Sequence, residues 1–353
     1  MQGGKLIVRN HPKQHYRTIF QQKTGFFVRK EESGFPEPTW AEDGPELIDL
    51  SITSFCRRKC SFCYRGANDV KYQHLGMDDI VSVVEQATGC GTLQIALGGG
   101  NPNQHPQFTE ILKLIREYDI IPSYTSNGEG LSDMILQTTA DCCGAMALSL
   151  YSPYDQNYYA SLIHKIRSYG IKVNVHAIVH KGNISLWTDW LNHPPHFLKE
   201  VNAIIFLNYK PIGNDRYKLC LNDKDSVRNF FFAADNCNAI RIGFDSCSVS
   251  GIAKWMHVPD VLVESCEAAC FSAFVNEDMK MYPCSFMSET NHYGDLREQS
   301  LVEIWKNNSY FKNFRNQGLV DRCIGCSHLE VCNGGCKFLD EINFCDIFKH
   351  QNK

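Results

Sequence analysis

The sequence predicts an α/β protein: a partial (β/α)6 barrel, resembling part of a TIM barrel, followed by a C-terminal cysteine-rich domain. Two observations predict it. From about residue 46 to 245, short apolar segments alternate with segments of helical periodicity, a pattern typical of βα units around a parallel sheet. After residue 245 the alternation stops, and residues 246–353 hold nine of the seventeen cysteines. A segment without a core of its own is usually held together by metal.

The barrel segment divides into six βα units. The predicted strands are 47–53, 93–98, 120–125, 145–150, 172–179 and 202–208. The predicted helices are 77–88, 107–118, 131–139, 156–169, 184–192 and 222–235. Six units fit a partial barrel, because a closed barrel of eight units needs a longer chain, and the functional face is expected at the C-terminal ends of the strands.

Residues 1–45 form a basic leader, in which seven Lys or Arg residues precede the first acid, Glu31. β-prone runs at 6–8 and 25–28 predict a small hairpin or edge strands, and three prolines between 36 and 45 predict an extended connector. The basic side chains form either a solvated face or a docking surface for an acidic partner peptide. We therefore expect three units: the leader at 1–45, the barrel at 46–245 and the cysteine-rich domain at 246–353.

Composition and charge narrow the functional class. No apolar run approaches the roughly 18 residues needed to span a bilayer, and the N-terminus lacks the apolar stretch of a signal peptide, so we expect a cytoplasmic protein with no membrane partner. A net charge of −4 argues against a general nucleic-acid binder. Seventeen cysteines is an odd number, and in a reducing compartment it favours metal binding or catalysis over disulfides.

The first cysteine motif is C-x3-C-x2-C at Cys56, Cys60 and Cys63, directly after the first predicted strand. Three thiolates suit a four-iron cluster in which one iron has no protein ligand, and an open metal position is where a substrate or cofactor binds. The alternative is structural zinc, which needs a fourth ligand nearby; His74, eleven residues on, is the nearest candidate.

This loop resembles that of the radical S-adenosylmethionine (SAM) superfamily, whose members have an aromatic residue directly before the last cysteine, as Phe62 is here. The superfamily's partial (β/α)6 barrel agrees with the alternation described above. The resemblance implies that the amino and carboxylate groups of SAM chelate the open iron.

Further strand ends resemble the superfamily's SAM-binding segments. The run GGGNP at 98–102 is similar to a Gly-Gly-Glu-Pro run that contacts the methionyl amine: Gly99, Gly100 and Pro102 match, and Asn101 replaces the acid. The resemblance also implies SAM contacts after the third, fourth and fifth strands, at Ser126, Asn127, Ser149 and Asn183. Ordinary strand-end turns are the alternative for each. His176, within the fifth predicted strand, and Glu200 are further polar groups that could point inward, and the sequence assigns a role to neither.

The C-terminal motif is C-x2-C-x5-C-x3-C at Cys323, Cys326, Cys332 and Cys336, followed by Cys345. It resembles the SPASM domain, which binds two auxiliary [4Fe–4S] clusters; a zinc ribbon is the alternative. The resemblance implies that Cys323, Cys326, Cys332 and Cys345 hold one cluster, while Cys336 reaches back to the other.

For that other, nearer cluster the resemblance points to Cys266 and Cys284, although Met279 stands where the pattern has glycine. Its fourth ligand is either Cys270, preferred because it is close to Cys266 in sequence, or Cys247.

These resemblances predict an oxidoreductase with three [4Fe–4S] clusters and SAM as cofactors. The expected reaction cleaves SAM to methionine and a 5′-deoxyadenosyl radical and then oxidises or cross-links a peptide or protein, as a maturase of ribosomal peptides does. The implied partners are a flavodoxin or ferredoxin as electron donor and, because the leader is short, a separate peptide-recognition protein. The alternatives are a small-molecule oxidase or dehydrogenase, and a non-catalytic iron–sulfur or zinc-binding module.

Overall fold

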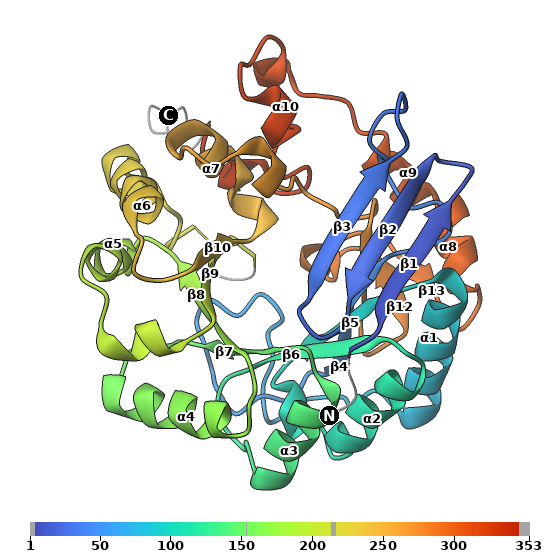
Figure 1. Cartoon of the computed structure of the whole chain (residues 1–353), viewed down its shortest axis with the longest axis horizontal. Helices are drawn as coiled ribbons and strands as arrows, with labels where there is room; N and C mark the ends of the chain where they lie inside the picture. Colours follow the sequence, from blue (N-terminus) through green and yellow to red (C-terminus); the bar gives the residue numbers. More distant parts are fainter. Residues whose placement is uncertain (1–3, 153, 213–216, 346–353) are drawn as a thin grey trace.

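The computed structural model describes residues 4–152, 154–212 and 217–345, and its centre is a ten-stranded sheet (Figure 1). Seven neighbouring strands are parallel and follow one another in chain order. They are β4 (Leu47–Thr53), β5 (Gln94–Gly99), β6 (Ile121–Ser126), β7 (Met146–Ser149), β8 (Val173–Val179), β9 (Ala203–Asn208) and β10 (Ile242–Phe244). Parallel strands covered by helices are rich in Val, Ile and Leu, and this is why β4 and β8 were recognisable in the sequence.

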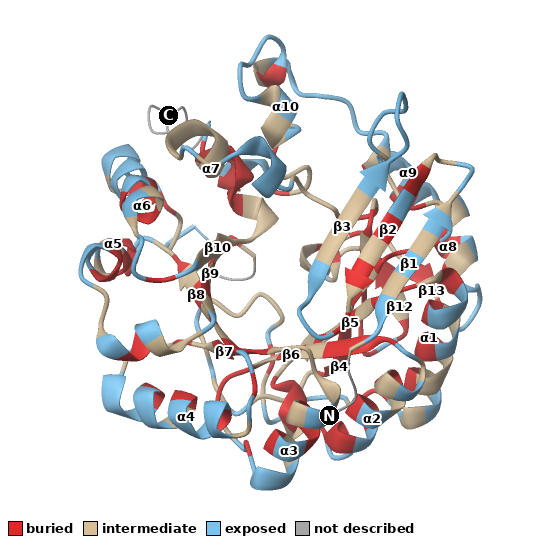
Figure 2. Cartoon of the chain, in the orientation of Figure 1, coloured by how far each residue is buried: buried red, intermediate tan, exposed pale blue. Residues whose placement is uncertain are grey.

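Six helices connect these strands and cover the outside of the sheet (Figure 2). They are α1 (Met77–Cys90), α2 (Phe108–Glu117), α3 (Asp133–Cys142), α4 (Gln156–Ser168), α5 (Ile184–Asn192) and α6 (Lys224–Asn236). Each buries an apolar stripe: Ile111, Leu112 and Ile115 of α2 face the sheet, for example. Side-chain caps at Ser132, Asp155 and Asp223 begin α3, α4 and α6, because they accept a hydrogen bond from an otherwise unpaired backbone N–H. The six predicted βα units are confirmed; the three-residue β10 was not predicted.

The cysteine-rich segment continues the same sheet. Strand β11 (Ser272–Val275) pairs in parallel with β4, and β12 (Lys280–Tyr282) and β13 (Gly294–Asp295) extend it antiparallel. The helices of this segment are α7 (Val249–Trp255), α8 (Leu301–Asn307), α9 (Ser309–Arg315) and α10 (Leu329–Cys332). The outermost strands, β10 and β13, do not meet within the described residues, so the barrel is partial.

Short 3-10 turns complete the secondary structure. They span Pro102–Gln104, His196–Glu200, Ser246–Ser248, Asp260–Leu262, Ser285–Met287, Asp321–Cys323 and Asp340–Ile342.

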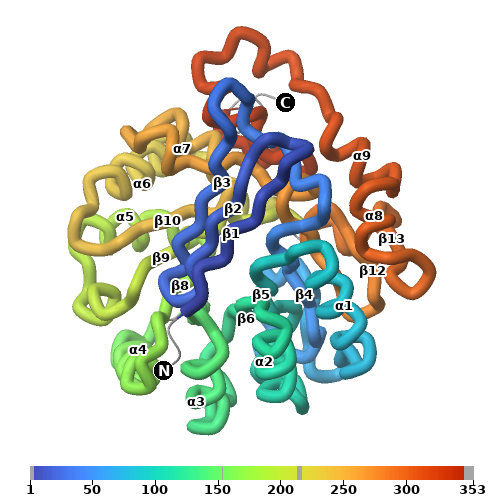
Figure 3. The backbone as a smooth tube through the Cα atoms, turned by 45° about the vertical axis from the view of Figure 1, so that its right-hand side comes forward, coloured from blue at the N-terminus to red at the C-terminus, as the bar shows by residue number. Residues whose placement is uncertain are grey.

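The leader forms an antiparallel sheet of β1 (Leu6–His11), β2 (Tyr16–Gln21) and β3 (Phe26–Glu31), one strand more than the predicted hairpin. Its inner face packs on the barrel, where Phe20 contacts Leu93 and Ile121 beside the N-terminal ends of β5 and β6 (Figure 3). The leader sheet therefore covers the end of the barrel opposite the strand C-termini. No helix among the described residues is both long and apolar enough to cross a membrane.

Candidate functional site

A single cavity of about 1270 Å³ occupies the inside of the partial barrel. Its lining includes the loop that follows β4, the C-terminal ends of the parallel strands and the cysteine-rich segment. Eight of the residues predicted to hold the SAM-binding cluster or SAM line it: Cys56, Cys60, Phe62, Cys63, Gly99, Gly100, Asn127 and Ser149. Three of the predicted auxiliary cysteines line it as well: Cys247, Cys266 and Cys284.

The three-cysteine loop is fixed by backbone hydrogen bonds to its surroundings. Cys56 N–H donates to Asn68 C=O (3.1 Å), and Asn101 N–H donates to Phe55 C=O (2.8 Å). The thiols lie close enough to influence one another: burial raises the pKa of Cys60 to about 11, with the charge of Cys63 adding to the effect. Thiols that share a site in this way release their protons when a metal takes the protons' place.

The strand end beside these thiols is shaped by glycine. Gly99 has φ of +107°, and a Cβ there would lie 2.1 Å from Ser51 Oγ and 2.2 Å from Thr53 C=O. A Cβ on Gly98 would meet nothing within 4 Å. Thus β5 can pack against the end of β4 while its backbone stays open toward the cavity. Three thiols on one loop beside an open backbone fit a thiolate-held cluster with a free position on the cavity side.

Aromatic side chains form the wall next to the thiols. The ring of Phe62 stacks on that of Tyr151, with centroids 5.9 Å apart and planes within 11°. The guanidinium of Arg58 lies over the ring of Tyr151, 4.3 Å from its centroid. The Tyr151 hydroxyl hydrogen-bonds Ser149. Phe62 and Ser149 therefore belong to one packed wall of the cavity.

Four residues predicted to contact SAM do not line the cavity: Asn101, Pro102, Ser126 and Asn183. Asn101 is 1% exposed; its Oδ1 accepts from Asn127 N–H (3.0 Å), and its Nδ2 donates to Glu129 C=O (3.2 Å). Ser126 Oγ donates to Asn103 Oδ1 (2.7 Å). These side chains brace the strand-end turn that carries Asn127 into the cavity.

Asn183 has a similar bracing role. It donates through Nδ2 to Tyr154 Oη (3.0 Å) and to Ile178 C=O (2.8 Å), and its Oδ1 accepts from His180 N–H (2.8 Å). Its side chain therefore holds the turn between β8 and α5.

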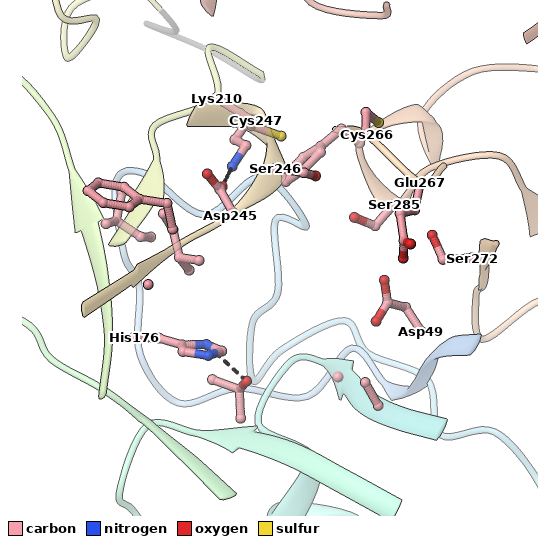
Figure 4. Close-up of a pocket in the computed structure, with 18 of the residues that line it drawn as sticks. Asp49, His176, Lys210, Asp245, Ser246, Cys247, Cys266, Glu267, Ser272 and Ser285 are labelled. Carbon is pink, nitrogen blue, oxygen red and sulfur yellow. Dashed lines mark hydrogen bonds and ion pairs between the residues drawn. The ribbon is translucent and has the colours of Figure 1, made fainter. Parts of the chain in front are cut away.

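A second group of thiols lines the same cavity, and Figure 4 shows two of them, Cys247 and Cys266. The thiols of Cys247 and Cys336 hydrogen-bond each other. Burial raises the pKa of Cys266 to about 11 and raises that of Cys284 further, and each is also affected by the charge of Cys247. Cys270 does not line the cavity, and its charged neighbours are Lys337, Arg315, Glu267 and Arg29. The thiol of Cys247 thus lies with those of Cys266, Cys284 and Cys336, while Cys270, which the sequence preferred, lies close enough to Cys266 for its charge to raise the pKa of that thiol too.

A third group of thiols lies at the end of the described chain. Burial raises the pKa of Cys332 to about 11, and the charges of Cys345, Cys323 and Cys326 raise it further. The chain reverses directly after α10 through Asn333, Gly334 and Gly335, all at positive φ. A Cβ on Gly335 would lie 2.2 Å from Asn343 Oδ1, so this turn requires glycine. In residues 4–152, 154–212 and 217–345, no three Cys, His, Asp or Glu side chains converge closely enough to hold a single metal ion.

Polar side chains inside the barrel complete the cavity, and the sequence prediction missed most of them. Asp49 of β4 faces the cavity, makes no hydrogen bond or ion pair with the described residues, and has its pKa raised to about 6 by burial (Figure 4). His176 of β8 hydrogen-bonds Thr125 Oγ1 (3.3 Å), and burial lowers its pKa to about 4. Lys210 pairs with Asp245. Asp49 and His176 could have been found in the sequence as an ionisable side chain within a strand that is mostly apolar.

Comparisons with known proteins agree with this arrangement. Residues 50–205 match the family "Radical SAM superfamily", and residues 266–327 match SPASM, an "iron-sulfur cluster-binding domain". The chain is 22% identical to an AdoMet-dependent heme synthase of Methanosarcina barkeri, over 86% of this chain and 97% of that protein. It is also 22% identical to a PqqA peptide cyclase of Xanthomonas oryzae pv. oryzae, over 83% of each.

Among solved structures, Streptococcus suis SuiB bound to its precursor peptide SuiA has the same fold. It superposes with a TM-score of 0.67 at 16% identity, over 83% of this chain and 72% of SuiB. The radical SAM match contains the three-cysteine loop. The SPASM match, which follows it in the chain, contains Cys266, Cys284, Cys323 and Cys326 of the later thiol groups. The chain belongs to the radical SAM superfamily and carries a C-terminal SPASM domain.

Proposed function

We propose that this protein is a radical SAM oxidoreductase that modifies a peptide substrate inside the barrel. Cys56, Cys60 and Cys63 hold the cluster that binds SAM, while Gly99, Gly100, Asn127, Phe62 and Ser149 line the SAM site. When bound, this cluster supplies the electron that splits SAM into methionine and a 5′-deoxyadenosyl radical able to remove hydrogen from an unactivated carbon. The protein's own task is to hold SAM and substrate together and to exclude water.

One observation carries the proposal: a single cavity joins the three-cysteine loop to Cys247, Cys266 and Cys284. Its volume of about 1270 Å³ exceeds the roughly 300–1,000 Å³ of ordinary small-molecule sites. A cavity of this size supports a site that takes SAM together with a substrate side chain. A substrate held there would lie between the thiols assigned to the SAM-binding cluster and those assigned to an auxiliary cluster.

We assign the two remaining thiol groups to auxiliary clusters, which makes three in all. Cys247, Cys266, Cys284 and Cys336 hold the cluster nearer the cavity, and Cys323, Cys326, Cys332 and Cys345 hold the distal one. When bound there, these clusters would supply an acceptor for the electron that the substrate gives up as it also loses a proton, and a flavodoxin or ferredoxin would supply the electron that starts the reaction. The net result is an oxidation or a cross-link.

We propose a peptide as the substrate class because peptide-modifying proteins are among the relatives and structures that match most of this chain. A PqqA peptide cyclase and the peptide-bound SuiB match most of this chain, although the heme synthase matches it over a similar length. A small-molecule substrate is therefore the second candidate, and the experiments below distinguish the two.

The first prediction tests the catalytic cluster. Anaerobically reconstituted protein is expected to hold about twelve irons, four in each of three clusters, and to form 5′-deoxyadenosine from SAM under dithionite. Replacing Cys56, Cys60 and Cys63 together by alanine is expected to remove about four irons and all SAM cleavage. Cys142→Ala, outside every predicted ligand set, is the matched control and keeps both. Unchanged 5′-deoxyadenosine formation in the triple variant would overturn the assignment, and zinc without SAM cleavage in the parent protein would favour a binding module.

The substrate class is tested with the same reconstituted protein. Short peptides encoded beside the gene are incubated with SAM and reductant, and mass spectrometry reads out a loss of hydrogen from the peptide. Peptide modification supports the proposal. Turnover of a small molecule with no change in any peptide contradicts the peptide assignment and leaves the SAM chemistry in place.

A further inference from the structure

Among the residues that the structure describes, no strand pairs with the outer edge of β3. In the leader sheet, which has the order β1-β2-β3, β3 pairs with β2 alone. Glu32 N–H donates to His15 C=O (2.7 Å) directly after the strand, which identifies 32 and 15 as a hydrogen-bonded pair. Backbone groups in an antiparallel ladder point alternately toward and away from the partner strand. The N–H and C=O groups of Phe27, Arg29 and Glu31 therefore point outward, away from β2.

This edge lies at a mouth of the cavity. Phe27 lines the same cavity as Cys56 and Gly99, and so do Val261 and Leu262 of the turn Asp260–Leu262. Val261 is 87% exposed and Leu262 71%, so exposed apolar side chains line the opening of the cavity together with Phe27. Figure 1 shows β3 as the strand of the leader sheet nearest to β9, β10 and α7.

The two faces of β3 differ. The side chains of Phe27 and Arg29 point inward: Phe27 lines the cavity, and Arg29 is held by Glu46 Oε2 (2.6 Å) and Glu267 Oε1 (2.5 Å). On the other face, Phe26 is 58% exposed. A strand added beside β3 would direct alternate side chains to these two faces. One set would therefore enter the cavity next to Phe27, while the other would lie along Phe26.

We propose that an extended segment of the peptide substrate docks on β3 as a fourth strand of the leader sheet and thereby delivers a side chain into the cavity. This inference rests on the proposed peptide substrate. A row of outward N–H and C=O groups is satisfied by another extended backbone, and continuity with the cavity distinguishes this edge from an ordinary exposed strand. Because backbone groups make the hydrogen bonds, docking does not depend on the basic side chains of the leader.

The test is residue-resolved hydrogen exchange on the cluster-loaded full chain. The probes are linear 14-residue peptides selected from a random displayed library against this protein. Bound peptide is expected to slow exchange at the amides of Phe27, Arg29 and Glu31 at least tenfold. The amides of Phe26, Val28 and Lys30 already pair with β2, so their exchange changes little. Protection confined to other segments, or a library with no binders, overturns the proposal.

Variants of Glu31 separate the backbone from the side chain. Proline at an edge position removes an outward N–H without breaking the ladder. Glu31→Pro is therefore expected to weaken peptide binding at least tenfold, whereas Glu31→Ala, the matched control, binds as the parent does; iron content and circular dichroism verify the fold. Equal binding by both variants contradicts pairing on this edge. If exchange at the β3 amides slows as the protein concentration rises, with no peptide present, a second copy of the chain pairs there. That result also overturns the proposal.

The outcomes for docking and for the proposed function are distinguishable. If a peptide is modified by the parent and by Glu31→Pro with the same KM, docking on β3 is wrong and the proposed function stands. If selected peptides pair with β3 but no peptide is ever modified, the proposed function fails and the docking surface stands.

Discussion

Cys247 lies on the turn that follows β10, and its thiol contacts that of Cys336, which comes from the far end of the cysteine-rich segment. Distance along the chain favoured Cys270, only four residues from Cys266. In the structure, however, the backbone C=O of Cys270 accepts from Ala41 N–H (2.8 Å), and its thiol lies among Lys337 and Arg315 rather than in the cavity. Tertiary contact, which sequence separation does not report, leads us to propose Cys247 as the ligand, although the charge of Cys270 also raises the pKa of Cys266.

The second prediction follows at the same scale. Cys247→Ala is expected to lower the iron content of the reconstituted protein by up to four and to weaken the absorption of the nearer auxiliary cluster. Cys270→Ala, its matched partner, is expected to keep the parental iron content. Iron analysis and Mössbauer spectra make the measurement. The reverse outcome, with iron lost only from Cys270→Ala, would restore the ligand set preferred from the sequence.

Asn101 shows what motif matching predicts and what it does not. The resemblance placed this residue correctly at the end of β5, but it could not indicate where the side chain points. Both ends of the amide are engaged, with Asn127 N–H and Glu129 C=O. An acid here would have no hydrogen to donate to that carbonyl, so this chain has an internal reason for the departure from Gly-Gly-Glu-Pro. By contrast, Cys56, Cys60 and Cys63 are close together in sequence, and the structure places all three in the wall of one cavity, as a shared site requires.

At the scale of elements, the strands within the βα alternation were predicted, and the short strands outside it were not. The predicted ranges 47–53 and 172–179 agree with β4 and β8 to within one residue. Strands β10 to β13 have two to four residues each and exist because neighbouring strands supply the pairing. Their sequences contain too few residues for a period to be visible. Strand β2, YRTIFQ, alternates buried and partly exposed residues, but its charged and polar members concealed it within the basic leader.

Arg29 connects three elements: the leader sheet, the start of β4 and the cysteine-rich segment. Its guanidinium binds Glu46 and Glu267 and lies 3.7 Å from the ring centroid of Phe271. Burial raises the pKa of Glu267, and Arg29 counteracts that shift. Removing the cation would leave two largely buried carboxylates facing each other without compensation.

The third prediction is therefore that Arg29→Met destabilises the protein by about 3 kcal/mol, because a broken buried ion pair costs far more than a lost surface charge. The thermal unfolding midpoint is expected to fall, and limited proteolysis is expected to cut the leader first. Lys30→Met removes the neighbouring exposed cation and is the control, with an expected effect within about 0.5 kcal/mol. Equal midpoints for the two variants would show that the leader sheet is held by apolar contacts alone.

At the scale of the whole molecule, the two matched domains share one sheet rather than meeting as separate bodies. Strand β11 pairs with β4, the strand whose following loop carries Cys56, Cys60 and Cys63. The described end of the chain is anchored in a similar way: Phe344 packs on Phe231 and Trp255, and its N–H donates to Ser250 Oγ (2.9 Å). These contacts involve no metal. The distal thiols are thus attached to a segment that the barrel side already holds in place.

The last prediction separates the distal cluster from SAM cleavage. Replacing Cys326 and Cys332 by alanine is expected to remove about four irons and to leave reductive SAM cleavage measurable, because these thiols do not line the cavity. Turnover of the peptide substrate is expected to fall much further, because the electron leaving the substrate loses its final acceptor. Metal binding also stabilises the fold of such segments, and the double variant could therefore unfold. Circular dichroism and retention of the catalytic cluster are the controls. The packing of Phe344 leads us to expect a folded variant. If that variant modifies peptide at the parental rate, the distal cluster is structural, and the nearer cluster alone takes the electron from the substrate.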